Sequence, residues 1–318
     1  MRKHLGTIIK ISITLLALLY VFSQVDFADI GQRLLEAELS WVLVGFLLFN
    51  LSLVVRAYRW LLLLHGIGSP IGFGRLVSLY FAANFFNSVL PSGFSGDVIR
   101  AVEAAQDVSV ETAAGTVLVD RATGLLALFM IGLAALPFRP DEFPNTLLWQ
   151  TTAVCVIGLV GGFVVLEGRL VRWLGRLVPQ FLQPAWQKID GVIRAVQACG
   201  WTAVWQAMGV SLLFNLMQVG WFITSGLALG YDLPLSHYFL VIPFLSLAIL
   251  LPSIGGLGIR EGLAPLLFAS AGLSAEQAVA LTLLVFAIER LSGFLGAPIY
   301  IIDTLRRSKK TAASPVDQ

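Results

Sequence analysis

Six apolar segments, each long enough to cross a membrane, constrain this chain more than any other feature. They cover residues 5–25, 41–64, 113–136, 147–166, 205–230 and 276–302. A helix needs about 20 apolar residues to cross the roughly 30 Å hydrocarbon layer of a bilayer. Helices satisfy every backbone hydrogen-bonding group inside lipid. The segments therefore predict an all-α polytopic membrane protein with six spanning helices.

Composition agrees with a lipid environment and excludes several kinds of chemistry. The chain is 57% hydrophobic and 13% charged, whereas soluble domains carry about 25% charged residues. Cys155 and Cys199 form no CxxC pair, and the three histidines are scattered along the chain. We therefore expect no redox centre, no metal site and no cofactor. The charge pattern also gives no indication of a nucleic-acid partner.

Two further apolar segments are too short to cross the bilayer. They cover residues 75–90, which end at Pro91, and residues 237–251, which end at Pro252. Either stretch makes only about 24 Å of helix. We interpret both as re-entrant hairpins beside a wet cavity, because non-helical backbone at membrane depth is tolerated where it lines such a cavity. A kinked spanning helix is the alternative at both places.

The same motif follows both short segments. A Pro-Ser-Gly-rich break leads to an arginine, and a later apolar run contains an acid-Arg-x-x-Gly sequence. The first copy is PSGFSGDVIR at 91–100 with DRATG at 120–124, and the second is PSIGGLGIR at 252–260 with ERLSG at 289–293. Ionisable residues inside a membrane are costly and usually functional. A repeated broken segment is a sequence sign of a transporter's binding site.

Basic residues predict the orientation of the chain, since cytoplasmic loops are enriched in Lys and Arg. The N-terminus, the loop 167–204 and the tail after Asp303 are basic, whereas the loops 26–40 and 137–146 are mainly acidic. We therefore expect both termini and the loop 167–204 in the cytoplasm. These assignments hold together when both short segments return to the side from which they entered.

This threading places the two halves of the chain in opposite orientations, as inverted repeats. The tripeptide FNL, at 49–51 and again at 214–216, is a weaker echo of the same symmetry. The expected divisions are a first repeat in 1–166 with the second beginning near 147, a cytoplasmic amphipathic linker in 167–204, the remainder of the second repeat in 205–303 and a basic tail in 304–318.

The linker contains a candidate membrane-surface helix at 168–182. Arg169, Arg172 and Arg176 recur at helical spacing, and leucines with a tryptophan supply the opposite side. This pattern favours a helix that lies in the inner headgroup plane. A solvated connector that simply obeys the positive-inside rule is the alternative.

The acids of the two motifs predict ion pairs inside the membrane. Each acid is adjacent in sequence to an arginine, so the two side chains point to different faces of a helix. The hairpin arginines are the obvious partners instead, in the combinations Arg100 with Asp120 and Arg260 with Glu289. Each acid would then hold a hairpin against the following span.

The neighbouring arginines, Arg121 and Arg290, remain available to an anionic ligand on this interpretation. Burying charges merely to fasten a hairpin would be costly, because apolar contacts could do the same. A purely structural ion-pair network without a ligand is the alternative.

Two further groups could bind phosphate. Arg56 and Arg59 are expected at the cytoplasmic end of the second span, where arginine either snorkels to the headgroups or holds phosphate with two parallel hydrogen bonds. Glycines at the hairpin turns allow either a simple tight turn or an anion site at the start of a following helix. These glycines are Gly93, Gly96, Gly255, Gly256 and Gly258.

The motifs NSVLPSGFSGDVIRA with VDRATG, and LPSIGGLGIREG with AIERLSG, resemble the transmembrane, flippase-like region of lysylphosphatidylglycerol synthases. The resemblance runs from the first apolar segment to Asp303. It implies an inverted-repeat helical fold with two re-entrant hairpins and a role in moving lipids between leaflets. The residues that match the family's motif positions are Pro91, Gly93, Gly96, Asp97, Arg100, Asp120, Arg121, Pro252, Gly255, Gly256, Gly258, Arg260, Glu261, Glu289 and Arg290.

The resemblance also implies a difference in activity. Full-length synthases append a soluble aminoacyl-transferase domain, whereas this sequence ends in a short basic tail, so lysyl transfer is not expected. We expect Asp97, Asp120, Glu261 and Glu289 to form ion pairs or to gate the cavity.

The function expected from the sequence is a cell-membrane transporter, not an enzyme. It would move a lipid with an anionic head between leaflets. The alternatives are a membrane-embedded transferase acting on a lipid phosphate, with Glu261 and Glu289 as candidate bases, and an accessory subunit that positions a lipid-modifying enzyme. Partners would be membrane lipids and either a second copy of the chain or such an enzyme.

Overall fold

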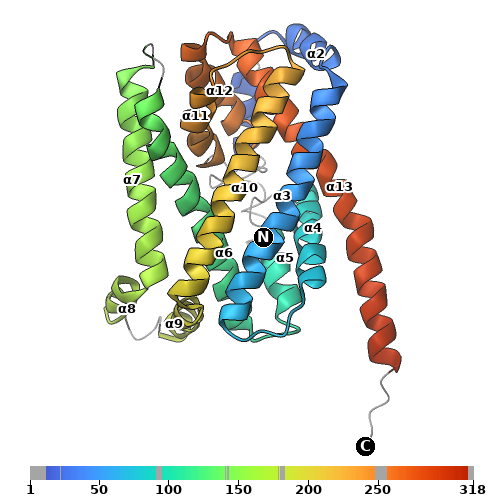
Figure 1. The fold of residues 1–318 in the computed structure, drawn as a ribbon, viewed down its shortest axis with the longest axis vertical. Helices are drawn as coiled ribbons and strands as arrows, with labels where there is room; N and C mark the ends of the chain where they lie inside the picture. Colours follow the sequence, from blue (N-terminus) through green and yellow to red (C-terminus); the bar gives the residue numbers. More distant parts are fainter. Residues whose placement is uncertain are drawn as a thin grey trace, which may run out of the picture.

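The chain folds into a bundle of α-helices, seen in a computed structural model (Figure 1). The structure describes residues 12–21, 23–90, 95–139, 141, 143–177, 179, 183–247 and 256–313. Within these ranges every regular element is a helix, which agrees with the all-α prediction.

Five of the described helices are long and apolar enough to cross a membrane. Their positions agree with five of the six predicted spans. They are α3 (Leu39–Gly66), α6 (Val110–Ala135), α7 (Asn145–Glu167), α10 (Gly200–Ala228) and α13 (Ala275–Ala313). The remaining predicted span, 5–25, is represented by a short apolar helix at Ser12–Val21, and the residues before it lie outside the described ranges.

Each of the two short apolar segments contributes the first helix of a pair of short helices, and the two pairs lie at opposite ends of the bundle (Figure 1). α4 (Phe73–Val89) and α5 (Ser95–Ala104) lie side by side near the end that carries α9. α11 (Leu235–Leu247) and α12 (Ile259–Phe268) lie at the other end. Each pair is joined through the Pro-Ser-Gly break, of which Pro91, Gly93, Pro252 and Gly255 lie outside the described residues.

Glycine is needed where the first helix pair closes. A Cβ atom at Gly96 would lie 2.5 Å from the Ala83 carbonyl oxygen, so the start of α5 can approach α4 only without a side chain. The Gly96 N–H donates a 2.7 Å hydrogen bond to Asn87 Oδ1 on α4. The two helices are therefore held together at backbone distance.

Peripheral helices fill the remaining connections. These are α2 (Phe27–Leu35), α8 (Arg169–Gly175) and α9 (Gln183–Ala198). The two linker helices differ in their packing: α8 leaves Leu170, Trp173 and Leu174 exposed on its surface. α9 instead buries Ala195 and Val196, and a Cβ atom at Gly115 of α6 would touch Ala195. α9 therefore packs against the bundle, next to the segment 168–182 for which a membrane-surface helix or a solvated connector was expected.

Two asparagines connect the halves of the chain across the bundle. Asn50 of α3 accepts a 2.8 Å hydrogen bond from Ser292 of α13. Asn215 of α10 donates a 3.1 Å hydrogen bond to the Gly124 carbonyl of α6. These are the central residues of the two FNL tripeptides, and each one contacts the acid-Arg-x-x-Gly helix of the other half.

α13 crosses α4 at very short range. Cβ atoms at Gly293 and Gly296 would overlap Ser88 and the Phe81 carbonyl of α4 respectively. The Gly of the second acid-Arg-x-x-Gly motif therefore serves a close helix crossing. This crossing brings Arg290 of α13 within hydrogen-bonding distance of the Asn87 carbonyl on α4.

Candidate functional site

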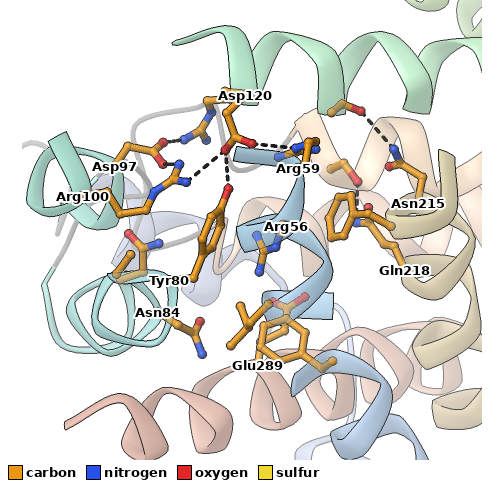
Figure 2. A pocket seen from close by; sticks show the side chains of 18 of the residues that line it. Arg56, Arg59, Tyr80, Asn84, Asp97, Arg100, Asp120, Asn215, Gln218 and Glu289 are labelled. Carbon is orange, nitrogen blue, oxygen red and sulfur yellow. Dashed lines mark hydrogen bonds and ion pairs between the residues drawn. The ribbon is translucent and has the colours of Figure 1, made fainter. Parts of the chain in front are cut away.

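A cavity of about 240 Å³ lies inside the bundle, where the helices of both halves meet (Figure 2). Residues of α3, α4, α5, α6, α10, α11 and α13 line it. Its walls carry five arginines and three carboxylates, which leaves a formal charge of +2. The charged lining residues are Arg56, Arg59, Arg100, Arg121, Arg290, Asp97, Asp120 and Glu289.

Asp120 is the centre of a buried ion-pair network (Figure 2). Its side chain is 1% exposed. Oδ1 accepts a 2.6 Å hydrogen bond from Arg59 Nε, and Oδ2 accepts one of 3.0 Å from Arg100 and another from the Tyr80 hydroxyl. The predicted contact between Arg100 and Asp120 is confirmed. Arg59 and Tyr80 are additional partners that sequence spacing did not indicate.

Arg121 is not available in the way that the sequence suggested. It forms an ion pair with Asp97 of α5, and Asp97 also accepts a 2.6 Å hydrogen bond from Arg100. The expectation that Arg121 lacks a carboxylate partner is therefore wrong. The reason is that Asp97 lies one turn before Arg100 on α5 and so brings a second acid to the same place.

The second half contains a smaller network. Arg260 Nη2 lies 3.2 Å from Glu289 Oε2, which confirms the predicted contact. Arg260 is 3% exposed and does not line the cavity; it lies behind Glu289, which does. Arg290 donates a hydrogen bond to the Asn87 carbonyl of α4, and its guanidinium carbon lies 4.5 Å from the centre of the Phe286 ring.

Arg56 points into the cavity between two aromatic rings. Its guanidinium carbon lies 5.5 Å from the ring centre of Tyr80 and 5.0 Å from that of Phe214. Its Nε is buried without a hydrogen-bond partner, and none of the described carboxylates forms an ion pair with it. Both Arg56 and Arg59 line the cavity, and α3 continues past them to Gly66, which favours the phosphate-binding alternative over snorkelling.

Of the two alternatives for the glycines, a tight turn and an anion site, the described ones favour the tight turn. The Gly96 N–H is bonded to Asn87, and the Gly258 N–H donates a 2.6 Å hydrogen bond to Glu261 Oε2. Gly256 and Gly258 have φ values of +87° and +83°, which favour glycine. These residues therefore shape the turn before α12 instead of presenting unused N–H groups.

Uncharged polar side chains complete the cavity, and the sequence interpretation did not identify them. Tyr80, Asn84 and Asn87 lie on one face of α4, and Asn215 and Gln218 lie on one face of α10. Each set recurs at three- or four-residue spacing inside an apolar run. That spacing is the signal that could have revealed them.

Apolar spans around a buried, arginine-rich cavity define a multi-pass α-helical membrane protein. The chain belongs to the lysylphosphatidylglycerol synthase TM region family, whose model matches residues 7–295. The family resemblance carried by the Pro-Ser-Gly and acid-Arg-x-x-Gly motifs is thus confirmed. Among curated proteins, none matches the chain.

Proposed function

We propose that this protein moves a lipid with an anionic, phosphate-bearing head between the two leaflets of the cell membrane. The observation that carries the proposal is the pair Arg56 and Arg290. Both line the cavity, and neither forms an ion pair with a carboxylate of the described chain. Together they match the formal charge of +2 left on the cavity walls.

The chemistry of these groups suits a phosphate oxygen. A guanidinium donates to phosphate through paired N–H groups in a planar fork. Buried Nε atoms of Arg56 and Arg290 have no partner within the described residues, and an unpaired buried donor is costly. A phosphate in the cavity would satisfy both donors, while the lipid tails remain in the bilayer.

The architecture supports movement between two sides. We infer that α4 with α5 and α11 with α12 are re-entrant hairpins in two inverted repeats, which enter from opposite faces of the membrane. Their places at opposite ends of the bundle support this inference (Figure 1). With the termini in the cytoplasm, the head would reach Arg56 and Arg290 from one leaflet and leave toward the other.

Transport can be tested with the purified protein in vesicles of phosphatidylcholine that contain phosphatidylglycerol with a fluorescent acyl chain. An impermeant quencher reports how much labelled lipid reaches the outer leaflet. The wild-type protein is expected to speed this movement without changing the lipid's mass. Arg56→Gln combined with Arg290→Gln should abolish it, and Arg139→Gln, in an exposed loop, is the matched control.

The same experiment separates the other functions. A covalently changed lipid would indicate a membrane-embedded transferase instead of a transporter. Neither movement nor chemical change would contradict the proposal and would favour an accessory subunit that acts through a partner lipid-modifying enzyme or through a second copy of the chain.

A further inference from the structure

Glu261 is a buried carboxylate that the proposed transport cycle has not yet used. It lies in the first turn of α12 and is 1% exposed. Oε2 accepts the Gly258 N–H, whereas Oε1 is buried and has no hydrogen-bond partner within the described residues. Asp120 is buried to the same degree, but two arginines and a tyrosine hold it. Glu261 forms no such ion pair in the described chain.

The charged surroundings of Glu261 are few. Arg260 precedes it on α12 and directs Nη2 to Glu289, while its Nη1 is buried and unpaired among the described groups. α13 contributes Glu289 and Arg290, and the helix Ser12–Val21 contributes no charged residue. On α11, His237 lies 2.9 Å from the Leu267 carbonyl, toward the far end of α12.

The first helix pair, α4 with α5, is held together without an acid at the position that corresponds to Glu261. When the two copies are aligned at their arginines, Ala101 stands where the second copy has Glu261. Arg100 still holds its hairpin, through Asp120 and Asp97. A need to fasten the hairpin therefore does not account for a carboxylate at position 261.

The burial of Glu261 favours uptake of a proton by its carboxylate. A carboxylate withdrawn from water without a full set of partners is stabilised when it takes up a proton. Ionisable residues at membrane depth commonly mark proton paths. Glu289 reaches from Arg260 to the cavity wall, so the charge on Glu261 is linked to the cavity through one arginine.

We propose that Glu261 binds and releases a proton during each transport cycle, so that the anionic head and the proton move together. This inference rests on the proposed function. Protonated Glu261 adds no negative charge near Arg290, and this favours binding of the anionic lipid head. Ionised Glu261 repels the anionic lipid head and competes with Glu289 for Arg260. The proton is taken from water on one side and returned to water on the other. Linkage requires that head and proton favour each other's binding equally.

The first test measures how a pH gradient changes the distribution of fluorescent phosphatidylglycerol in the phosphatidylcholine vesicles described above. The lipid is expected to accumulate on the alkaline side, by up to about tenfold for a gradient of one pH unit when one proton accompanies each lipid. Glu261→Gln keeps an acceptor for the Gly258 N–H but cannot exchange a proton. It should still exchange lipid between leaflets, with no accumulation on either side.

The matched control is Glu276→Gln, since Glu276 also bonds near a helix start, to Ser274, but lies away from the cavity. It should accumulate lipid as the wild type does. A wild-type protein that moves lipid without responding to the gradient would overturn the coupling, as would a Glu261→Gln variant that still accumulates it.

A second measurement does not depend on transport. Infrared difference spectra of the wild type after a pH jump should contain a protonated-carboxyl band that Glu261→Gln lacks. An unchanged band in the variant, or its absence from the wild type, would overturn the proton site. Absence of all lipid movement would instead count against the proposed function, and the infrared band would still decide whether Glu261 takes up a proton.

Discussion

The guanidinium carbon of Arg56 lies 5.0 Å from the centre of the Phe214 ring, which faces it across the cavity from α10. A ring face attracts a cation without neutralising it. Phe214 and Tyr80 thus hold Arg56 in place inside the bundle while its charge remains available to a ligand. This differs from the arginines around Asp120, whose charge is already matched by a carboxylate.

The first prediction concerns Arg56 alone. Arg56→Gln should slow movement of an anionic lipid about tenfold to a hundredfold, because a hydrogen bond to a charged group contributes about 1.5–3 kcal/mol. Arg56→Lys should restore only part of the rate, since a point charge lacks the planar fork. The rate of quenching in the vesicle assay gives the result. Equal rates for the Gln variant and Arg139→Gln would place the ligand elsewhere.

The second prediction concerns stability of the Asp120 network. Arg59→Leu leaves Asp120 with one fewer partner and should lower the free energy of unfolding by about 3–5 kcal/mol, whereas adding Asp120→Leu should recover part of the loss. Thermal unfolding in detergent provides the measurement. Arg33→Ala breaks a half-exposed ion pair with Asp29 and should cost less than about 1 kcal/mol. Additive effects of Arg59→Leu and Asp120→Leu would contradict the network.

The third prediction tests the crossing of α13 and α4. Gly296→Ala places a Cβ atom against the Phe81 carbonyl. This carbonyl belongs to the backbone of α4, so it cannot rotate away as a side chain could. We expect a loss of about 1–3 kcal/mol in unfolding free energy, as for other overpacked sites. Gly209→Ala on α10 is the control, because no atom outside the neighbouring backbone of its own helix lies within 4 Å of its Cβ position. There the substitution should be neutral or stabilising.

The fourth prediction concerns orientation. Ser109 and Ser274 lie directly before α6 and α13, and both helices carry an acid-Arg-x-x-Gly motif. Inverted repeats require cysteines at these two positions to react with an impermeant thiol reagent from opposite sides, with Ser109 on the cytoplasmic side. The native Cys155 and Cys199 are buried and would be replaced first. Reaction of both positions from one side would rule out the inverted arrangement.

Hydropathy predicted the helical fold and five of its spans, because the cost of exposing backbone and charge to lipid restricts the sequence strongly. The same restriction indicated that Asp120 and Glu289 form ion pairs, as they do. The sequence left open whether Arg56 snorkels to the headgroups or holds a phosphate, and the structure places it on the cavity wall. Basic residues in an apolar run are typical of its cytoplasmic end, yet α3 continues through Trp60 and Leu63 to Gly66, and these residues are buried.

The choice of ionic partners was the least predictable part of the site. Helical spacing shows which residues share a face, but it does not show which face of another helix they meet. Asp97 lies between Arg100 and Arg121, and Asp120 lies between Arg59 and Arg100. The three-dimensional packing of α3, α5 and α6 decides that sharing, so Arg121 could not be assigned from its position after Asp120.

The hydrogen bonds of Asn50 and Asn215 restrict which substitutions the two halves of the chain can tolerate independently. Each asparagine belongs to one half of the chain and is bonded to the other, at Ser292 and Gly124. A substitution that alters the final helix of either half therefore also affects its partner helix in the other half, whose contact residue lies 91 or 242 positions away in the sequence. Exchanging one half for that of a distant relative should fail unless the matching asparagine contact is exchanged with it.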